Sequence, residues 1–234
     1  MHEFGLSTIL RQVTALSQSA SPSVIASAGD TIKTAISHSI IRDRRDDSLL
    51  PTGGYLLKST QEYAGLGGGD VKYLKATVES QVIKTFRDLW PRTHFIFGAR
   101  SGIMWSLEKN GRTRLTDRFY LGGPTDVRGF REFGIGPKDG SICFRNGADV
   151  DDSVGGEAFL AYSASVMFPV PNAPVTWPLR LQAFVNGGSL LPLDQCRPML
   201  IQTNSSECRR NIFSTLEISF NWGRNGSYLS NTYW

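Results

Sequence analysis

The feature that most constrains this chain is a two-residue alternation of apolar and polar side chains over unusually long segments. In LRLQAFVN, residues 179–186, leucine, alanine and valine alternate with arginine, glutamine, phenylalanine and asparagine. Successive side chains of a β-strand point to opposite faces, so this period predicts a strand with one apolar and one polar side. The pattern recurs at about eight places, roughly residues 3–14, 30–42, 54–64, 71–86, 94–107, 157–169, 178–189 and 212–222.

The length of these segments points to a membrane wall. Several run for 12 residues or more, whereas strands in soluble proteins usually have about 5–6 residues and tilted membrane strands need about 9–11. The polar faces carry Lys75, Glu79 and Arg100 at mid-strand, as expected around a wet lumen. The sequence therefore predicts an all-β fold, an antiparallel transmembrane β-barrel segment. Aromatic residues near the predicted strand ends fit interfacial girdles: Tyr55, Trp90, Trp105, Phe168, Trp177 and Trp222.

Composition excludes several other classes of protein. The net charge of +4 arises from 25 basic and 21 acidic residues spread along the chain, so nucleic-acid binding is not expected. No apolar run approaches the roughly 20 residues of a transmembrane helix. The three cysteines do not form a zinc or redox motif, and the three histidines lie outside any nucleophile motif, so we expect no metal, no cofactor and no enzymatic activity. These residues are Cys143, Cys196, Cys208, His2, His38 and His94.

One long connection interrupts the strand pattern. Residues 109–156 show no convincing strand, and a connection of this length is usually functional or disordered. It contains DRFYLGGPTDVRGFREFGIGP, residues 117–137, with five glycines and two prolines. The stretch is too rich in glycine for a helix and too aromatic for an ordinary exposed loop. We expect it to have a role of its own.

This loop resembles the large sixth loop of the outer-membrane barrel-assembly superfamily, the bacterial surface antigen barrels. The residues that carry the resemblance are Phe119, Gly122 and Gly123, followed by the tetrad Val127, Arg128, Gly129 and Phe130. Three further stretches resemble the same family in the same order, RDRRDDSLLPTGGYLL (42–57), GGEAFLAYSASVMFPVP (155–171) and LRLQAFVNGGSL (179–190). Together they are most similar to the barrel subunit of the mitochondrial sorting and assembly machinery.

The resemblance implies a sixteen-stranded barrel, of which this chain looks like a C-terminal-half portion. Residues 1–190 would be a partial barrel domain, and residues 191–234 a divergent tail with one weak strand. The implied function is insertion of β-barrel precursors into the mitochondrial outer membrane, by strand templating without covalent chemistry. The implied partners are the lipid bilayer, other subunits of that machinery and unfolded precursor clients. A passive pore or polypeptide-secretion channel of the same superfamily, or a soluble all-β binding module, stays open.

In this family the long loop folds back into the lumen and braces the wall. The resemblance gives Arg128 the role of brace, since its guanidinium carries five donors in a rigid fork. Gly129 allows close backbone approach, and Phe130 packs on the wall. The implied wall partners are Phe184, Asn186 and Gly188. Many bacterial members have aspartate where Asn186 stands, so we expect a pairing here without ionic assistance.

Overall fold

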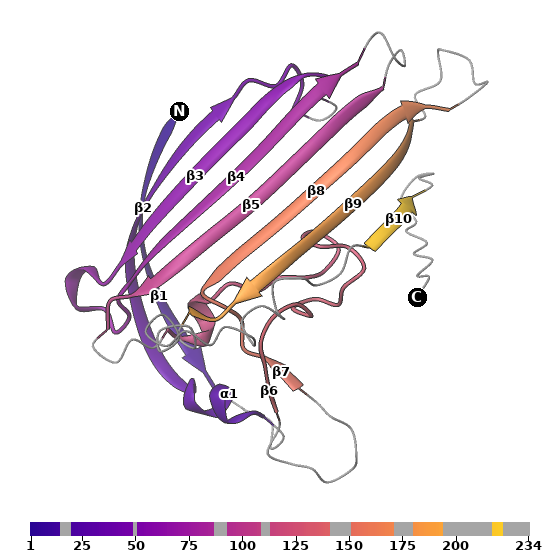
Figure 1. Cartoon of the computed structure of the whole chain (residues 1–234). Coiled ribbons are helices and arrows are strands. Elements are labelled where there is room, and N and C mark those ends of the chain that lie inside the picture. Colours follow the sequence, from indigo (N-terminus) through magenta and orange to yellow (C-terminus); the bar gives the residue numbers. More distant parts are fainter. Residues whose placement is uncertain are drawn as a thin grey trace, which may run out of the picture.

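Eight antiparallel strands form one large curved sheet in the computed structural model (Figure 1). The structure describes residues 1–14, 20–48, 51–86, 93–108, 113–140, 151–170, 180–193 and 217–221. In spatial order the strands are β1 (His2–Val13), β2 (Gly29–Asp43), β3 (Gly54–Ala64), β4 (Tyr73–Thr85), β5 (His94–Ser106), β8 (Ala158–Pro169), β9 (Arg180–Leu191) and β10 (Glu217–Asn221). The predicted antiparallel β fold is confirmed.

The predicted alternation defines the two faces of this sheet. On β4 the side chain of Tyr73 points inward and is 2% exposed, whereas those of Leu74 and Val82 point outward and are 39% and 51% exposed. The β4–β5 pairing runs without interruption from Tyr73↔Ser106 to Thr85↔His94. A uniform register keeps each face consistent across neighbouring strands.

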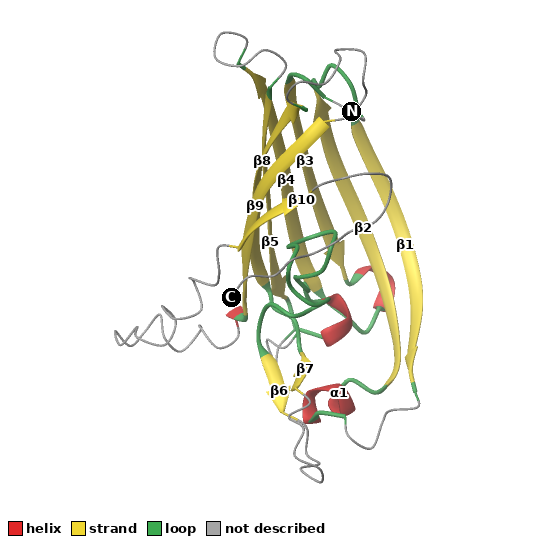
Figure 2. Cartoon of the chain, turned by 90° about the vertical axis from the view of Figure 1, so that its right-hand side faces the viewer, coloured by secondary structure: helices red, strands yellow, loops and turns green. Residues whose placement is uncertain are grey.

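The sheet forms a trough, with the long connection inside its concave face (Figure 2). Regular twist between neighbouring strands produces this curvature. Strands β1 and β10 are the two edges, and the sheet is not closed within the described ranges. Among the residues described, no helix has the length and apolar character to cross a bilayer.

The turn between β2 and β3 shows why the RDRRDD…PTGG pattern folds as it does. The Asp46 carboxylate accepts hydrogen bonds from the backbone N–H of Thr52 at 2.9 Å and of Gly53 at 3.1 Å, and from the Thr52 hydroxyl. Gly54 has φ +103°, and a Cβ there would lie 2.2 Å from the carbonyl oxygen of Arg44. A side chain at position 54 would therefore displace the backbone of the turn.

The opposite ends of the strands carry short helical turns. Helix α1 (Pro22–Ala26) lies in the β1–β2 connection, and the 3-10 turn η1 (Leu66–Gly68) lies between β3 and β4. In the turn η1, Gly65 and Gly67 have φ +116° and +67°. Glycine adopts this left-handed backbone at little cost.

The long connection between β5 and β8 is more ordered than its sequence predicts. It contains a 3-10 turn, η2 (Leu115–Asp117), and a small hairpin of β6 (Lys138–Gly140) and β7 (Asp151–Ser153). The prediction that 109–156 contains no strand was therefore wrong. Strands of three residues are too short to show an alternating pattern.

Some predictions fall on residues outside the described ranges. These residues are Cys143, Cys196, Cys208, Trp90, Trp177 and Trp222. The division of the chain into a barrel domain and a tail at residue 190 stays a prediction.

Candidate functional site

The loop of residues 117–137 packs on the concave face of the sheet, and the apolar core of the molecule lies between them. Loop residues Phe119, Leu121 and Val127 are 9%, 1% and 0% exposed. They share one cluster with wall residues that include Tyr73 and Met104. Burying each such side chain stabilises the fold by about 1.5–3 kcal/mol. These apolar side chains of the loop are therefore part of the core on the concave side of the sheet.

The paired glycines of the motif are required by the backbone. Gly122 and Gly123 have φ +114° and +107°, which non-glycine residues rarely adopt. A Cβ at Gly122 would also lie 2.6 Å from the carbonyl oxygen of Arg131. The two glycines turn the chain so that Leu121 pairs with Ile135 and the tip folds back toward the wall.

Wall glycines make room for the loop at two places. A Cβ at Gly102 of β5 would lie 2.8 Å from the ring of Phe119. A Cβ at Gly188 of β9 would lie 2.8 Å from Leu121 Cδ2 and 3.2 Å from Val127 Cγ2. Glycine at these positions permits contact between loop side chains and the wall backbone.

The tetrad Val127–Phe130 lies against β9 and its neighbours. Val127 is fully buried, and Phe130 packs on the apolar cluster from its margin. The guanidinium carbon of Arg128 lies 4.7 Å from the ring centroid of Phe184, which is a cation–π distance. Gly129 has φ +93°, so the turn at the tip also uses left-handed backbone.

The three expected wall partners lie at alternate positions on the inner face of β9. Phe184 lies under Arg128, and Gly188 faces Val127. Asn186 is 5% exposed and stands opposite Ser163 of β8. Between the described side chains of Arg128 and Asn186 no hydrogen bond is formed. Arg128, at the tip of the loop, thus contacts the wall by stacking its guanidinium on the ring of Phe184.

An ion pair that sequence reasoning missed holds the other side of the tip. Arg100 Nη2 of β5 lies 2.7 Å from Asp126 Oδ1, immediately before the tetrad. In the strand registers Arg100 stands opposite Glu79, and Glu79 stands opposite Lys58. The wall therefore presents a row of alternating charges that the loop carboxylate extends. A charged residue at the centre of a polar strand face was the available signal.

A second charged group that sequence reasoning missed surrounds Asp117 at the base of the loop. Its Oδ1 lies 2.8 Å from Arg11 Nη1 and 3.6 Å from Lys33 Nζ, and it accepts a hydrogen bond from the Tyr73 hydroxyl at 3.2 Å. Lys75 Nζ donates to the Asp117 carbonyl oxygen at 2.9 Å. One loop residue thus contacts β1, β2 and β4. Glu62 of β3 completes the group, 2.5 Å from Lys33 Nζ and 3.0 Å from the Tyr73 hydroxyl.

The small hairpin ties the loop to the β1–β2 connection. The backbone N–H of Ser21 donates to Asp152 at 2.9 Å, and the hydroxyl of Ser23 donates to Asp139 at 2.5 Å. Figure 2 shows α1 lying beside β6 and β7 below the trough. These contacts join segments more than a hundred residues apart and attach the connection at the end of β1 to the long loop.

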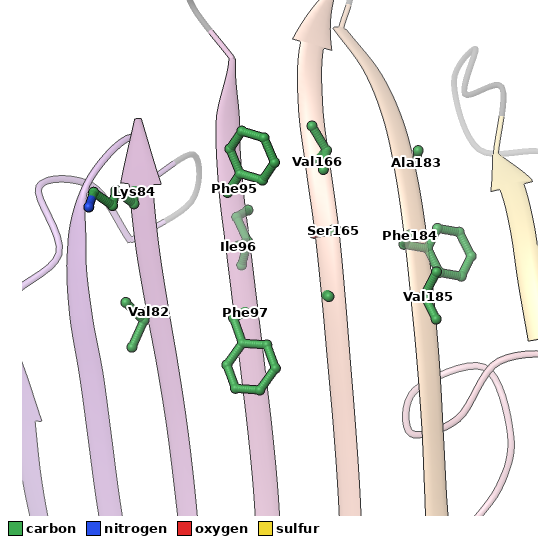
Figure 3. Close-up of a pocket in the computed structure, with 11 residues that line it drawn as sticks. Val82, Lys84, Phe95, Ile96, Phe97, Ser165, Val166, Ala183, Phe184 and Val185 are labelled. Carbon is green, nitrogen blue, oxygen red and sulfur yellow. The ribbon is translucent and has the colours of Figure 1, made fainter. Parts of the chain in front are cut away.

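The outer face of the sheet is apolar where the inner face is charged. A shallow hollow of about 360 Å³ spans the outer sides of β4, β5, β8 and β9. The residues that line it include the small Ala164 and Ala183. They also include Val82, Phe95 and Phe97, which Figure 3 shows on β4 and β5. Among the residues that line this hollow, Lys84 is the charged one. This face offers apolar contact and few hydrogen-bonding groups.

The histidines lie at the strand ends away from the loop. The imidazoles of His2 and His38 are hydrogen bonded to each other at 3.2 Å on β1 and β2, and His94 Nδ1 is 2.7 Å from the hydroxyl of Thr85.

The loop and wall bring together ion pairs, a cation–π contact and an apolar core. This arrangement can fix the shape of the wall and the position of the loop.

Comparison with known proteins identifies the family from the amino-acid sequence. Residues 2–224 match the Omp85 superfamily domain. A SAM50-like protein of Schizosaccharomyces pombe is 39% identical over 202 residues, covering 84% of this chain and 39% of that protein. The sorting and assembly machinery component 50 homolog of Homo sapiens is 34% identical over 190 residues, covering 80% of this chain and 38% of that protein.

A solved structure supports the fold. BamA from Haemophilus ducreyi lacking POTRA domains 1–3 matches with a TM-score of 0.60 and 18% identity, covering 75% of this chain and 33% of that one. The chain spans 39% and 38% of the two curated relatives described above.

Proposed function

Because this chain belongs to the Omp85 superfamily, we propose that it forms part of a β-barrel that inserts barrel precursors into the mitochondrial outer membrane. The names of its relatives, sorting and assembly machinery component 50 and its homologues, support this assignment. The barrel part represented here supplies wall strands and the lumen loop. The proposal extends to the localisation, so the chain is an integral protein of that membrane.

The observation that carries the membrane assignment is the distribution of polarity between the two faces. On the outer face Leu6, Phe97 and Leu160 are 74%, 52% and 49% exposed, while the inner face holds the charged groups around Asp117 and Arg100. An exposed apolar face of this extent is a liability in water and is what lipid-facing barrel strands present. This contrast between the two faces argues against the alternative that the chain is a soluble all-β binding module.

The loop that fills the concave face of the sheet argues against the alternative that the chain forms a passive pore. Phe119, Leu121 and Val127 occupy the space in front of the wall and are buried there. A loop packed in this way narrows the lumen. The alternative of a pore or polypeptide-secretion channel requires this segment to move aside.

The mechanism that we propose uses strand addition and no covalent step. In the part of the chain that the structure describes, β1 and β10 are the edges of the sheet, and a client segment would pair with the backbone N–H and C=O groups of an edge strand by β-augmentation. Such groups are costly in hydrocarbon when unpaired, so the edge favours the capture of a strand. The proposed partners are the bilayer, the other subunits of the machinery and unfolded precursors of barrel proteins.

In this mechanism the loop braces the wall that carries the edge. The stacking of Arg128 on Phe184 supports the brace, together with the close approach of Val127 to Gly188. These contacts hold β9, the neighbour of β10, against the loop. The tetrad and its wall partners therefore act as a scaffold for strand addition.

Two experiments test the proposal in order. Alkaline carbonate extraction of mitochondria that express the chain should leave it in the membrane pellet, and release into the supernatant would refute every membrane assignment. The second experiment measures assembly of an imported barrel precursor in mitochondria depleted of the endogenous machinery subunit, with the chain placed in its full-length context. Restored assembly is expected. Membrane retention combined with ion conductance but no assembly would favour the pore.

A further inference from the structure

The hollow on the outer face of the sheet has a regular composition. It spans two rows of side chains, one above the other in Figure 3. In the strand registers the upper row is Lys84, Phe95, Val166 and Ala183, and the lower row is Val82, Phe97, Ala164 and Val185. Each row has a phenylalanine on β5 and smaller side chains on β8 and β9. The hollow is therefore a step between the tall side chains of β5 and the lower surface of β8 and β9.

The walls of this hollow suit a hydrocarbon chain. Its volume is about 360 Å³, and Phe97, Val82 and Phe95 are 52%, 51% and 40% exposed. In a bilayer, lipid chains cover an outward-facing apolar surface of this kind. A chain that lies along the step contacts the phenylalanine rings at its side and the small side chains of β8 and β9 beneath it. Contact on two sides binds a chain more firmly than a flat wall does, because each additional close contact adds dispersion attraction.

A single charged residue marks one end of the hollow. Lys84 is the last residue but one of β4. Alternation makes it the charged residue among the outward-facing positions of the described strands β3, β4, β5, β8 and β9. A lysine on a lipid-facing surface lays its apolar stem along that surface and extends its ammonium to the headgroups. The Lys84 end of the hollow therefore lies at the level of the lipid headgroups.

Two phenylalanines hold the lysine ammonium at this end. Lys84 Nζ lies 5.2 Å from the ring centroid of Phe86, and that ring packs edge to face on Phe95 with 5.1 Å between the centroids. A ring face attracts a cation but leaves the three N–H donors of an ammonium available to an anion. None of the ion pairs among the described residues includes Lys84. This end of the hollow thus presents a positioned positive charge that fits an anionic group.

We propose that this hollow binds one diacyl phospholipid with an anionic headgroup, with an acyl chain in the step beside Phe95 and Phe97 and the headgroup phosphate at Lys84. Charge selects the class of lipid, because a zwitterionic headgroup brings no net negative charge to the ammonium. A protein partner suits the hollow less well, since it would place polar backbone groups against walls that offer few hydrogen-bonding groups. The inference rests on the membrane location proposed above and is independent of precursor assembly.

Photoreactive lipids test the proposal strand by strand. The full chain is reconstituted in phosphatidylcholine vesicles that contain a small, equal mole fraction of either phosphatidylglycerol or phosphatidylcholine with a diazirine in one acyl chain. Mass spectrometry measures the labelling of β8 and β9. The reference is the labelling of Leu74 and Trp105, which face outward opposite each other at the far ends of β4 and β5 and are 39% and 44% exposed.

Phosphatidylglycerol should label β8 and β9 about fivefold more than phosphatidylcholine does, as expected for the attraction of one lysine to anionic lipid, whereas the reference residues should show no preference. Lys84→Gln should abolish the preference. The matched control Lys58→Gln removes the same charge from an exposed lysine on the inner face and should leave the preference unchanged. Ala164→Leu fills the hollow and should lower labelling by both lipids toward the reference level, whereas Ala76→Leu, on the outer side of β4 away from the hollow, should not.

Equal labelling of β8 and β9 by the two lipids would overturn the proposal, and so would a preference that survives Lys84→Gln. Labelling of the reference residues without labelling of β8 and β9 would also overturn it and would indicate a protein contact at the hollow. Absence of labelling on every strand would refute the membrane location itself, and the lipid site with it. Labelling requires no client, so its failure is distinct from failure of the assembly function.

Discussion

Leu121→Ala tests whether the stability of this fold arises between the loop and the wall. Leu121 is 1% exposed, belongs to the apolar cluster, and its Cδ2 would lie 2.8 Å from a Cβ at Gly188. Because the wall backbone beneath it is fixed by the strand ladder, the wall cannot move in to fill the gap. Substitutions of this kind cost about 2–5 kcal/mol.

We expect a loss of about 3 kcal/mol in the free energy of unfolding, since the site is fully enclosed. That corresponds to a change of more than about a hundredfold in the unfolding equilibrium. Leu160→Ala provides a matched control on the outer face, where the leucine is 49% exposed. Lipid chains are as apolar as leucine and can fill the space, so the control should cost about 1 kcal/mol or less.

The assay is reversible denaturant unfolding of the chain in lipid vesicles, followed by tryptophan fluorescence. Free energies come from the midpoints and slopes of the unfolding curves. Both variants replace leucine with alanine, so the difference between their losses in free energy of unfolding reports the difference between the surroundings of the two side chains. Equal costs for Leu121→Ala and Leu160→Ala would refute the conclusion that the core lies under the loop.

Three further outcomes follow from other contacts. Arg128→Ala should lower the free energy of unfolding by about 0.5–2 kcal/mol through loss of the cation–π contact with Phe184, and it should slow precursor assembly in the full-length protein. Phe184→Leu should cause the same loss of stability. If both variants left stability and assembly unchanged, the role of Arg128 as a brace would be refuted. Gly122→Ala should cost at least about 1–2 kcal/mol, because φ +114° is unfavourable for alanine, as measured by the same unfolding curves. Hydrogen bonds from Thr52 and Gly53 hold the pKa of Asp46 below its ordinary value; its folded-state pKa is depressed, so its contribution is present above the unfolded pKa and is lost as pH falls. Amide exchange of the turn should therefore accelerate in acid, and Asp46→Asn should abolish that acceleration.

The loop explains why there is an apolar core on the inner face of this sheet. The inner face of a barrel segment is polar and charged, so the strands alone bury little apolar surface there. Phe119, Leu121 and Val127 provide that surface from the loop, and Gly102 and Gly188 allow them to approach. The glycines of the motif are thus distributed between the loop, where they turn the chain, and the wall, where they admit it.

Much of the wall could be predicted from the sequence. The ends of β3, predicted at 54–64, are Gly54 and Ala64, and β5 ends one residue before its predicted end, at Ser106. Alternation is a local property of a pleated backbone, so it is readable without knowledge of the partner strand. Arg100 was assigned to the polar face from that pattern alone, and in the structure it pairs with Asp126 of the lumen loop on that face.

The site was harder to predict. The motif located the loop, and the resemblance gave the wall residues that it faces, but Asp117 and Asp126 were not identified as anchors. Their partners Arg11 and Arg100 are 106 and 26 residues away in sequence. Such pairs depend on strand register and on the depth to which the loop enters the trough.

The sequence by itself determined the period, length and polarity of the strands, and the glycine-rich loop motif. These features depend on backbone geometry and on the partition of side chains between apolar and polar surroundings, which act within a single strand. Only the tertiary structure decided that Arg128 stacks on Phe184, that Asp126 pairs with Arg100, and that Asp117 joins three strands. Contact between distant charges requires the curvature of the whole sheet, because curvature brings the inner face of each strand toward the same loop.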